Sequence, residues 1–175
     1  MKEEIEFLKT YVRDIPDFPK KGIIFKDITP LLQNAKALQI VTDVIADRYI
    51  DRRIDLVVGV EARGFIMAPT IAYKLKAGFV MVRKPGKLPY KTHTATYDLE
   101  YGTDSLEIHQ DAIKPGQRVL IVDDVLATGG TANAVAGLVN ILGGKLVESA
   151  FLIELDFLDG REKLSGCPIF SLIHY

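Results

Sequence analysis

Short, continuously apolar runs alternate along this chain with longer runs in which apolar residues recur every three or four positions. Runs of the first kind predict the strands of a buried parallel sheet, at residues 55–60, 79–82, 118–122, 147–155 and 169–173. Runs of the second kind predict helices near residues 3–12, 35–49, 65–76 and 131–142. This alternation predicts an α/β fold with a central, mostly parallel sheet flanked by helices.

Two segments interrupt the alternation. Residues 15–30 are punctuated by proline and glycine, which predicts an irregular segment. Residues 84–91 carry further prolines and a glycine, and two weakly apolar strands follow them, which predicts a mobile hairpin. Because no repeat or linker divides the 175 residues, we expect one domain over the whole chain, residues 1–175.

Composition and charge narrow the classes of function. The 22 Lys and Arg residues nearly balance the 23 Asp and Glu residues, which disfavours a nucleic-acid-binding protein. Cys167 is the single cysteine, so it forms neither an intramolecular disulfide nor a cysteine metal cage, and it favours a reducing compartment. The long charge-free run at 125–144 contains glycines, threonines and asparagines, and we interpret it as a loop and a buried helix rather than a membrane span. The chain also begins without the pattern of a secretory signal. We therefore expect a cytoplasmic protein with neither nucleic acid nor membrane as a partner.

The strongest chemical signal is VLIVDDVLATGGT at residues 119–131. A buried strand ends there in Asp123 and Asp124, and the loop that follows opens a helix at about Thr131. Ligands of open α/β sheets bind beyond the carboxyl ends of strands, and a glycine-rich helix N-terminus offers backbone N–H groups to a phosphate. The two carboxylates would repel that phosphate, so we expect them to bind ribose hydroxyls or, through water, a magnesium ion.

Other phosphate motifs are absent from the sequence. It contains neither GxxxxGK[ST] nor a GxGxxG that follows a strand, which disfavours a P-loop hydrolase and a dinucleotide-binding enzyme. The alternative for residues 127–131 is a plain strand-to-helix turn capped by the aspartates. The apolar strand, the paired acids and the following helix, taken together, favour the phosphate site.

Residues 119–131 resemble the phosphoribosyl diphosphate (PRPP) binding motif of the type I phosphoribosyltransferases. FPKKGIIFKDITPLL (18–32), EARGF (61–65), RKPGKLP (83–89) and LEYG (99–102) resemble segments of the adenine-specific members of that family. The resemblance implies a type I phosphoribosyltransferase-like fold with a small N-terminal hood at about 1–34 and a flexible hairpin lid at about 84–110. It also implies a purine salvage reaction in which adenine and PRPP give AMP and pyrophosphate, with Mg²⁺ required.

The resemblance assigns roles to residues around PRPP. The 5-phosphate is assigned to Ala127, Thr128, Gly129, Gly130 and Thr131. The ribose hydroxyls are assigned to Asp123 and Asp124, which are also the candidates for indirect contact with magnesium. The pyrophosphate is assigned to Arg63, Arg83, Lys84 and Lys87, with Lys91 as a further candidate. The resemblance further implies a cis peptide in the loop at Glu61–Arg63 and a homodimer in which one subunit supplies part of the basic cluster to its neighbour.

The remaining assignments concern the base. Glu100 is expected to be the catalytic acid/base at adenine N9, with Tyr101 beside it in the lid. Adenine is assigned to Ile24, Phe25, Lys26, Val125, Leu126 and Leu155: Phe25 would stack on the ring and the Ile24 backbone would read its edge. Lys26 departs from the arginine usual in the family, so a bidentate contact is not expected there.

Two other functions remain open at this point. One is a non-catalytic regulator that senses PRPP, although the sequence carries no added helix-turn-helix or basic surface. The other is a sibling enzyme for a different base, which would lack the Phe25 segment and LEYG. Three histidines, His93, His109 and His174, show no metal-binding spacing, and we expect them and Cys167 to have structural roles.

Overall fold

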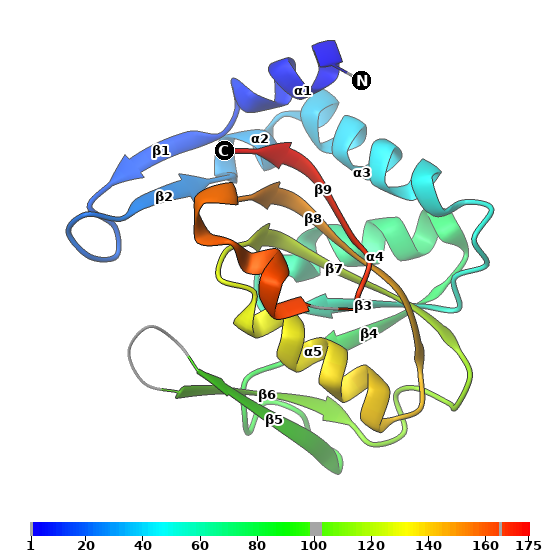
Figure 1. Cartoon of the computed structure of the whole chain (residues 1–175). Helices are drawn as coiled ribbons and strands as arrows, with labels where there is room; N and C mark the ends of the chain where they lie inside the picture. Colours follow the sequence, from blue (N-terminus) through cyan, green and yellow to red (C-terminus); the bar gives the residue numbers. More distant parts are fainter. Residues whose placement is uncertain (1, 99–102, 165) are drawn as a thin grey trace. The chain divides into compact units, whose positions relative to one another are not determined.

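The computed structural model describes residues 2–98, 103–164 and 166–175 (Figure 1). The chain falls into two compact units, residues 1–44 and 45–175. Helix α3 (Ala35–Tyr49) crosses that boundary. The hood and lid boundaries given above stay predictions, as does the single domain.

The N-terminal unit contains α1 (Lys2–Lys9), β1 (Arg13–Pro16), β2 (Ile24–Asp27) and α2 (Thr29–Gln33). The expectation of an irregular segment at 15–30 is wrong where β1 and β2 pair as an antiparallel ribbon. Two ion pairs cross this ribbon, Arg13–Asp27 at 2.6 Å and Lys26–Asp14 at 2.7 Å. Both strands are four residues long and half polar, with no apolar alternation, and Pro19 and Gly22 lie in the loop between them.

The C-terminal unit is built on a five-stranded sheet in the order β4-β3-β7-β8-β9. Its strands are β3 (Leu56–Val60), β4 (Gly78–Val82), β7 (Arg118–Leu126), β8 (Lys145–Glu154) and β9 (Ile169–His174). All neighbouring strands in it are parallel. The parallel pairing of these five strands confirms the α/β fold with a central parallel sheet. Strands of such a sheet are continuously apolar because both of its faces are covered.

Helix α4 (Gly64–Leu75) connects β3 to β4, and helix α5 (Gly130–Ile141) connects β7 to β8. The two crossovers run in opposite directions along the sheet, so right-handed connections place the two helices on opposite faces, as Figure 1 shows. Successive residues of β3 face opposite sides: Val58 packs in the cluster that contains Val135 and Leu138 of α5, whereas Gly59 lies against Ala68 of α4.

The predicted hairpin consists of β5 (Thr92–Asp98) and β6 (Thr103–His109), which pair antiparallel throughout. Leu106 and Ile108 are buried in the core cluster on the α5 face, and this contact anchors β6 to the sheet unit. The 3₁₀ turns η1 (Asp156–Leu158) and η2 (Gly160–Leu164), which the apolar pattern does not predict, lie between β8 and β9. Among the described residues, no helix combines the length and apolarity needed to cross a membrane.

Candidate active site

The carboxyl end of β3 lies beside β7, where Gly59 is paired with Val122, and β7 continues four residues further to Leu126. The chain leaves β3 toward one edge and β7 toward the other, so this is the point at which the strand order switches. Loops diverge at such a point and leave a crevice for ligands. The segments that follow these two strands, residues 61–63 and 127–131, are the ones for which the sequence predicts phosphate and pyrophosphate binding.

The predicted phosphate loop lies between β7 and α5. Residues 127–129 form a bend, and α5 begins at Gly130, one residue earlier than expected. Gly129 caps the helix with a φ of +80°, a conformation that favours glycine, and it has no side chain to accept hydrogen bonds from the first helical turn. The N–H groups at this helix N-terminus, together with the half-buried Thr128 and Thr131, can therefore serve an anionic ligand.

Asp123 and Asp124 lie inside β7, since the strand continues to Leu126 instead of ending at Val122. The expected end of this strand is wrong because β8 pairs with residues 123–126 as it does with the apolar part. Burial raises the pKa of both carboxyl groups, and the charge of Asp124 raises that of Asp123 further. Arg63 Nε lies 2.7 Å from Asp124 Oδ2 and supplies the compensating charge. Asp124 is thus buried and Asp123 half-buried, at a position where hydroxyl groups or a cation would relieve the cost of burial.

Glu61 forms the centre of the predicted pyrophosphate cluster, although it was not among the predicted site residues. Arg83 Nε and the backbone N–H of Lys84 each donate to Glu61 Oε2 at 3.1 Å, and Lys87 Nζ donates to Oε1. Lys87 is the largest cause that lowers the pKa of Glu61, to about 2, and Arg83 contributes to the same effect. The peptide between Glu61 and Ala62 is cis, as the resemblance implies. The signal for Glu61 in the sequence is an acid directly after a buried apolar strand, two residues before Arg63.

Further acids order the rest of residues 83–91. Lys84 Nζ donates to Asp104 at 2.8 Å, and the backbone N–H of Gly86 donates to Glu107 at 3.1 Å. Arg83 and Glu107 also exchange backbone hydrogen bonds of 3.0 and 2.7 Å, which attach this segment to β6. Lys91 is exposed. The structure therefore brings together Arg83, Lys84 and Lys87 around acidic residues, and places Arg63 at Asp124.

The residues predicted to bind adenine come from both units. In the N-terminal unit, Phe25 packs edge-on against Phe18 with ring centroids 5.2 Å apart. Ile24 is exposed, and its β1 partner Pro16 has no N–H, so the Ile24 carbonyl receives no ladder hydrogen bond from that residue. Lys26 forms the ion pair with Asp14 described above.

In the C-terminal unit, Val125 and Leu155 are half-buried and lie at the ends of neighbouring strands, because the Leu155 N–H donates to the Leu126 carbonyl at 3.0 Å. The Leu126 side chain is packed in a core cluster with Phe151 and Leu164. Glu100 and Tyr101 lie outside the described residues, so their assigned roles stay predictions.

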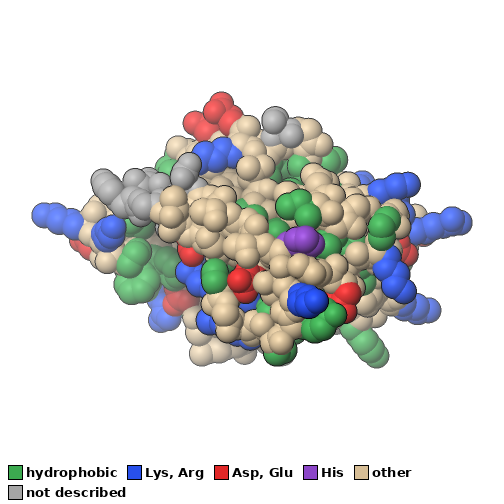
Figure 2. All heavy atoms as spheres, turned by 90° about the horizontal axis from the view of Figure 1, so that it is seen from below, with side chains coloured by type: hydrophobic (Ala, Val, Ile, Leu, Met, Phe, Trp, Pro, Cys, Tyr) green, Lys and Arg blue, Asp and Glu red, His purple; other side chains and the backbone are tan. Residues whose placement is uncertain are grey.

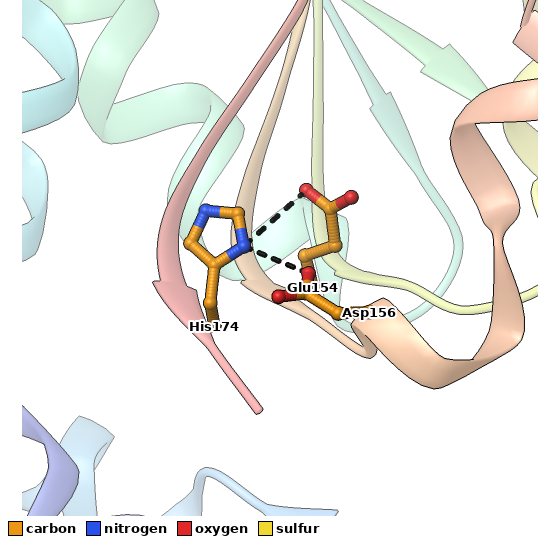
Figure 3. A group of neighbouring side chains, drawn as sticks. All are labelled: Glu154, Asp156 and His174. Carbon is orange, nitrogen blue, oxygen red and sulfur yellow. Dashed lines mark hydrogen bonds and ion pairs between the residues drawn. The ribbon is translucent and has the colours of Figure 1, made fainter.

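A second polar cluster was also missed from the sequence. Glu154, Asp156 and His174 converge at the ends of β8 and β9, with ligand-type atoms within 4.8 Å of one another (Figure 3). Two Arg161 nitrogens donate to the two Glu154 carboxylate oxygens at 2.6 and 2.7 Å. No spacing rule finds this group, because it depends on the pairing of β8 with β9.

On the face drawn in Figure 2, basic side chains are interspersed with acidic and apolar ones.

Comparisons with known proteins cover nearly the whole chain. The family model described as "phosphoribosyl transferase domain" matches residues 27–171. An adenine phosphoribosyltransferase of Geobacter metallireducens is 63% identical over 168 residues, which are 96% of this chain and 98% of that protein.

Solved structures agree with the sequence comparison. The crystal structure of an adenine phosphoribosyltransferase from Thermoanaerobacter pseudethanolicus superposes with a TM-score of 0.95 at 57% identity, covering 98% of this chain and 99% of the other. The Saccharomyces cerevisiae adenine phosphoribosyltransferase, complexed with an imino-altritol bisphosphate and adenine, gives a TM-score of 0.93 at 43% identity, covering 99% and 100%. The likeness therefore extends through fold and sequence together.

Proposed function

Because this chain belongs to the phosphoribosyltransferase family, and within it to the adenine phosphoribosyltransferases, we propose how its own residues carry out the family reaction. The chain transfers the 5-phosphoribosyl group of PRPP to N9 of adenine and forms AMP and pyrophosphate, a step of purine salvage. The observation that carries the assignment of residues is the switch point, where a glycine-capped helix N-terminus follows the strand that carries the buried Asp124 and the half-buried Asp123.

The loop at residues 127–131 binds the 5-phosphate in this proposal. Backbone N–H groups and threonine hydroxyls are suited to its oxygens, and the helix dipole adds a favourable field. Asp123 and Asp124 accept hydrogen bonds from the ribose hydroxyls, which lowers the cost of their burial and fixes the sugar in the chain's frame. A fixed sugar leaves the anomeric carbon in one position relative to the incoming base. This positioning lowers the entropic cost of bringing the two reacting atoms together.

The pyrophosphate binds to Arg63, Arg83, Lys84 and Lys87 in this proposal. These cations are paired with Asp124, Glu61 and Asp104 in the structure. A pyrophosphate competes with those carboxylates because it offers more charge and more acceptor oxygens to the same donors. Cations held on the leaving group stabilise the charge that develops as the bond to the sugar breaks.

Magnesium fits the donors of this site. Asp123 and Asp124 offer the carboxylate oxygens that Mg²⁺ prefers, at a position where burial disfavours uncompensated negative charge. We propose that they hold it indirectly, through water and the ribose hydroxyls. When bound, magnesium would add positive charge next to the pyrophosphate.

Adenine recognition is assigned to the residues that the resemblance identifies. Phe25 stacks on the ring, and the Ile24 backbone accepts from the 6-amino group and donates to N1. A 6-oxopurine presents the opposite donor and acceptor pattern and leaves these groups unpaired. Val125, Leu126 and Leu155 supply apolar contact. Lys26 contributes by its ion pair with Asp14 in the β1–β2 ribbon that carries Ile24 and Phe25. Glu100 takes the proton from N9.

We also propose a homodimer located in the cytoplasm. Its support is an apolar stripe on α4, where Ile66 and Tyr73 lie two turns apart and are 42% and 86% exposed. The single cysteine supports the reducing compartment.

An assay with purified protein tests the reaction and the choice of base together. Adenine, PRPP and Mg²⁺ should yield AMP, whereas hypoxanthine and guanine should yield no nucleotide, and the reaction without Mg²⁺ should fail. Nucleotide formed from a 6-oxopurine would contradict the roles given to Phe25 and Ile24. PRPP binding without any transfer would favour a regulator.

A further inference from the structure

The predicted phosphate loop rests on the backbone of a second segment. A Cβ atom built on Gly160 would lie 2.1 Å from the Ala127 carbonyl oxygen and 3.2 Å from the Gly129 nitrogen. A Cβ atom built on Gly129 would lie 2.2 Å from the Gly160 carbonyl oxygen. No side chain fits at either position without a shift of the backbone, and both glycines are buried. The position of the loop therefore depends on the position of Gly160.

Gly160 is in turn anchored by its neighbour. Arg161 Nε and Nη2 donate to the two oxygens of Glu154 at 2.6 and 2.7 Å, in the planar two-bond geometry that only arginine provides. Glu154 is the last residue of β8 and its side chain is only 5% exposed. It is paired in the sheet with Leu126, the residue that precedes the phosphate loop. The ion pair thus connects the end of the strand next to the loop with the segment on which the loop rests.

We propose that the Arg161–Glu154 ion pair is a positioning element for phosphate binding: it holds Gly160 against Ala127 and Gly129 and so fixes the backbone N–H groups that receive the 5-phosphate. This inference rests on the proposed role of residues 127–131. Arg161 and Glu154 act through the loop and need no contact with the ligand.

The neighbouring residues argue against a cation site at the same place. His174 Nδ1 lies 2.8 Å from Asp156 and 3.9 Å from Glu154, so these three residues could in principle ligate a metal (Figure 3). Both oxygens of Glu154, however, already accept hydrogen bonds from Arg161. A metal would have to displace a guanidinium group from a buried carboxylate, so the ion pair is the better interpretation.

The chain contains a matched control at the other end of β8. Arg48 donates to both oxygens of Glu148 at 2.8 and 3.1 Å, and the Glu148 side chain is 4% exposed. This ion pair has the same two-bond geometry, strand and burial as Arg161–Glu154, but Glu148 lies six residues earlier on β8 and also accepts from Arg52 Nη1 at 3.0 Å. It should contribute to stability and leave phosphate binding unchanged.

The test compares Arg161→Ala with Arg48→Ala by calorimetric binding of AMP, which carries the 5-phosphate, and of pyrophosphate. We expect Arg161→Ala to raise the Kd for AMP and the KM for PRPP about 10-fold, with the Kd for pyrophosphate and kcat changed by less than about 3-fold, since small misplacements of binding groups are costly. Arg48→Ala should lower Tm by less, because Arg52 still pairs with Glu148, and it should leave the Kd for AMP within about 2-fold. Equal changes in AMP binding for both variants, or no change for Arg161→Ala, would overturn the proposal.

Glu154→Gln provides a second route if Arg161→Ala does not fold, because the amide keeps one acceptor for Arg161; it should raise the Kd for AMP by a smaller factor, and an unchanged Kd would count against the proposal. In the double variant the two effects should not multiply. Multiplying effects would mean that Arg161 contacts the ligand independently.

Thr131→Ala separates this inference from the site assignment on which it rests. If Thr131→Ala weakens AMP binding and Arg161→Ala does not, only the positioning role fails; if neither does, the phosphate site itself is wrong.

Discussion

Replacing Glu61 with glutamine removes the negative charge around which the basic segment is ordered. In the native chain this carboxylate accepts from Arg83, from the backbone of Lys84 and from Lys87. Glutamine has nearly the same shape but only one acceptor oxygen and no charge, so the substitution tests the charge with little change in packing.

The hydrogen bonds and the pKa of Glu61 give similar values for the free energy of unfolding that Glu61→Gln removes. Three hydrogen bonds to a charged group, with partners as exposed as Lys87 (46%) and Arg83 (31%), contribute about 0.5–1 kcal/mol each after screening. Lys87, as the largest cause, helps to lower the pKa of Glu61 from 4.5 to about 2. That difference sets an upper bound of about 3 kcal/mol, which the exposure of the partners reduces. We therefore expect Glu61→Gln to lower the free energy of unfolding by about 2 kcal/mol at pH 7.

The pH dependence supplies the sharper assay. Because the folded-state pKa of Glu61 is below its unfolded value, this stabilisation is fully present above about pH 5 and is lost as the pH falls toward 2. Urea unfolding at a series of pH values should show the wild-type and Glu61→Gln curves converging at low pH. Glu162→Gln, at an exposed position in η2, is the control and should follow the wild type within about 0.5 kcal/mol. A difference that stays constant from pH 7 to pH 2, or is absent at pH 7, would refute this account of Glu61.

The remaining predictions concern the base, the proton and the assembly. Phe25→Ala should raise the KM for adenine about 10-fold or more and leave the KM for PRPP nearly unchanged, because base–aromatic stacking is worth about 1–3 kcal/mol. Steady-state kinetics with each substrate varied in turn would measure both KM values, and a rise in both would contradict a role for Phe25 in binding the base alone. Glu100→Gln should lower kcat about 100-fold with a modest change in the KM for PRPP, and an unchanged kcat would reject its acid/base role. Light scattering should give twice the mass of one chain, and Tyr73→Glu, on the exposed face of α4, should shift it toward the single-chain mass; a monomeric wild type would contradict the proposed dimer.

The sheet and its helices were predictable because their sequence signals are local. A strand covered on both faces is continuously apolar, so β3, β4 and β7–β9 are visible in the sequence, as are α3, α4 and α5 by their period. The β1–β2 ribbon was not predictable from its pattern, because its short strands do not alternate apolar with polar residues and its ion pairs form only when the two strands meet.

The site was predictable in its parts and not in its pairing. Asp124 is conspicuous as an acid in an apolar strand and Arg63 as a base shortly after one, but their ion pair exists because β7 lies beside β3. The same holds for Glu61, whose basic partners lie 22 to 26 residues further along the chain. Contacts set by tertiary structure have no signature in a single sequence.

A crystal structure of the chain with AMP would test the central claim most directly. The account predicts the phosphate on the backbone N–H groups of residues 127–131, the ribose hydroxyls on Asp123 and Asp124, and the adenine ring stacked on Phe25. A phosphate bound elsewhere, with residues 127–131 making no contact to it, would contradict the account.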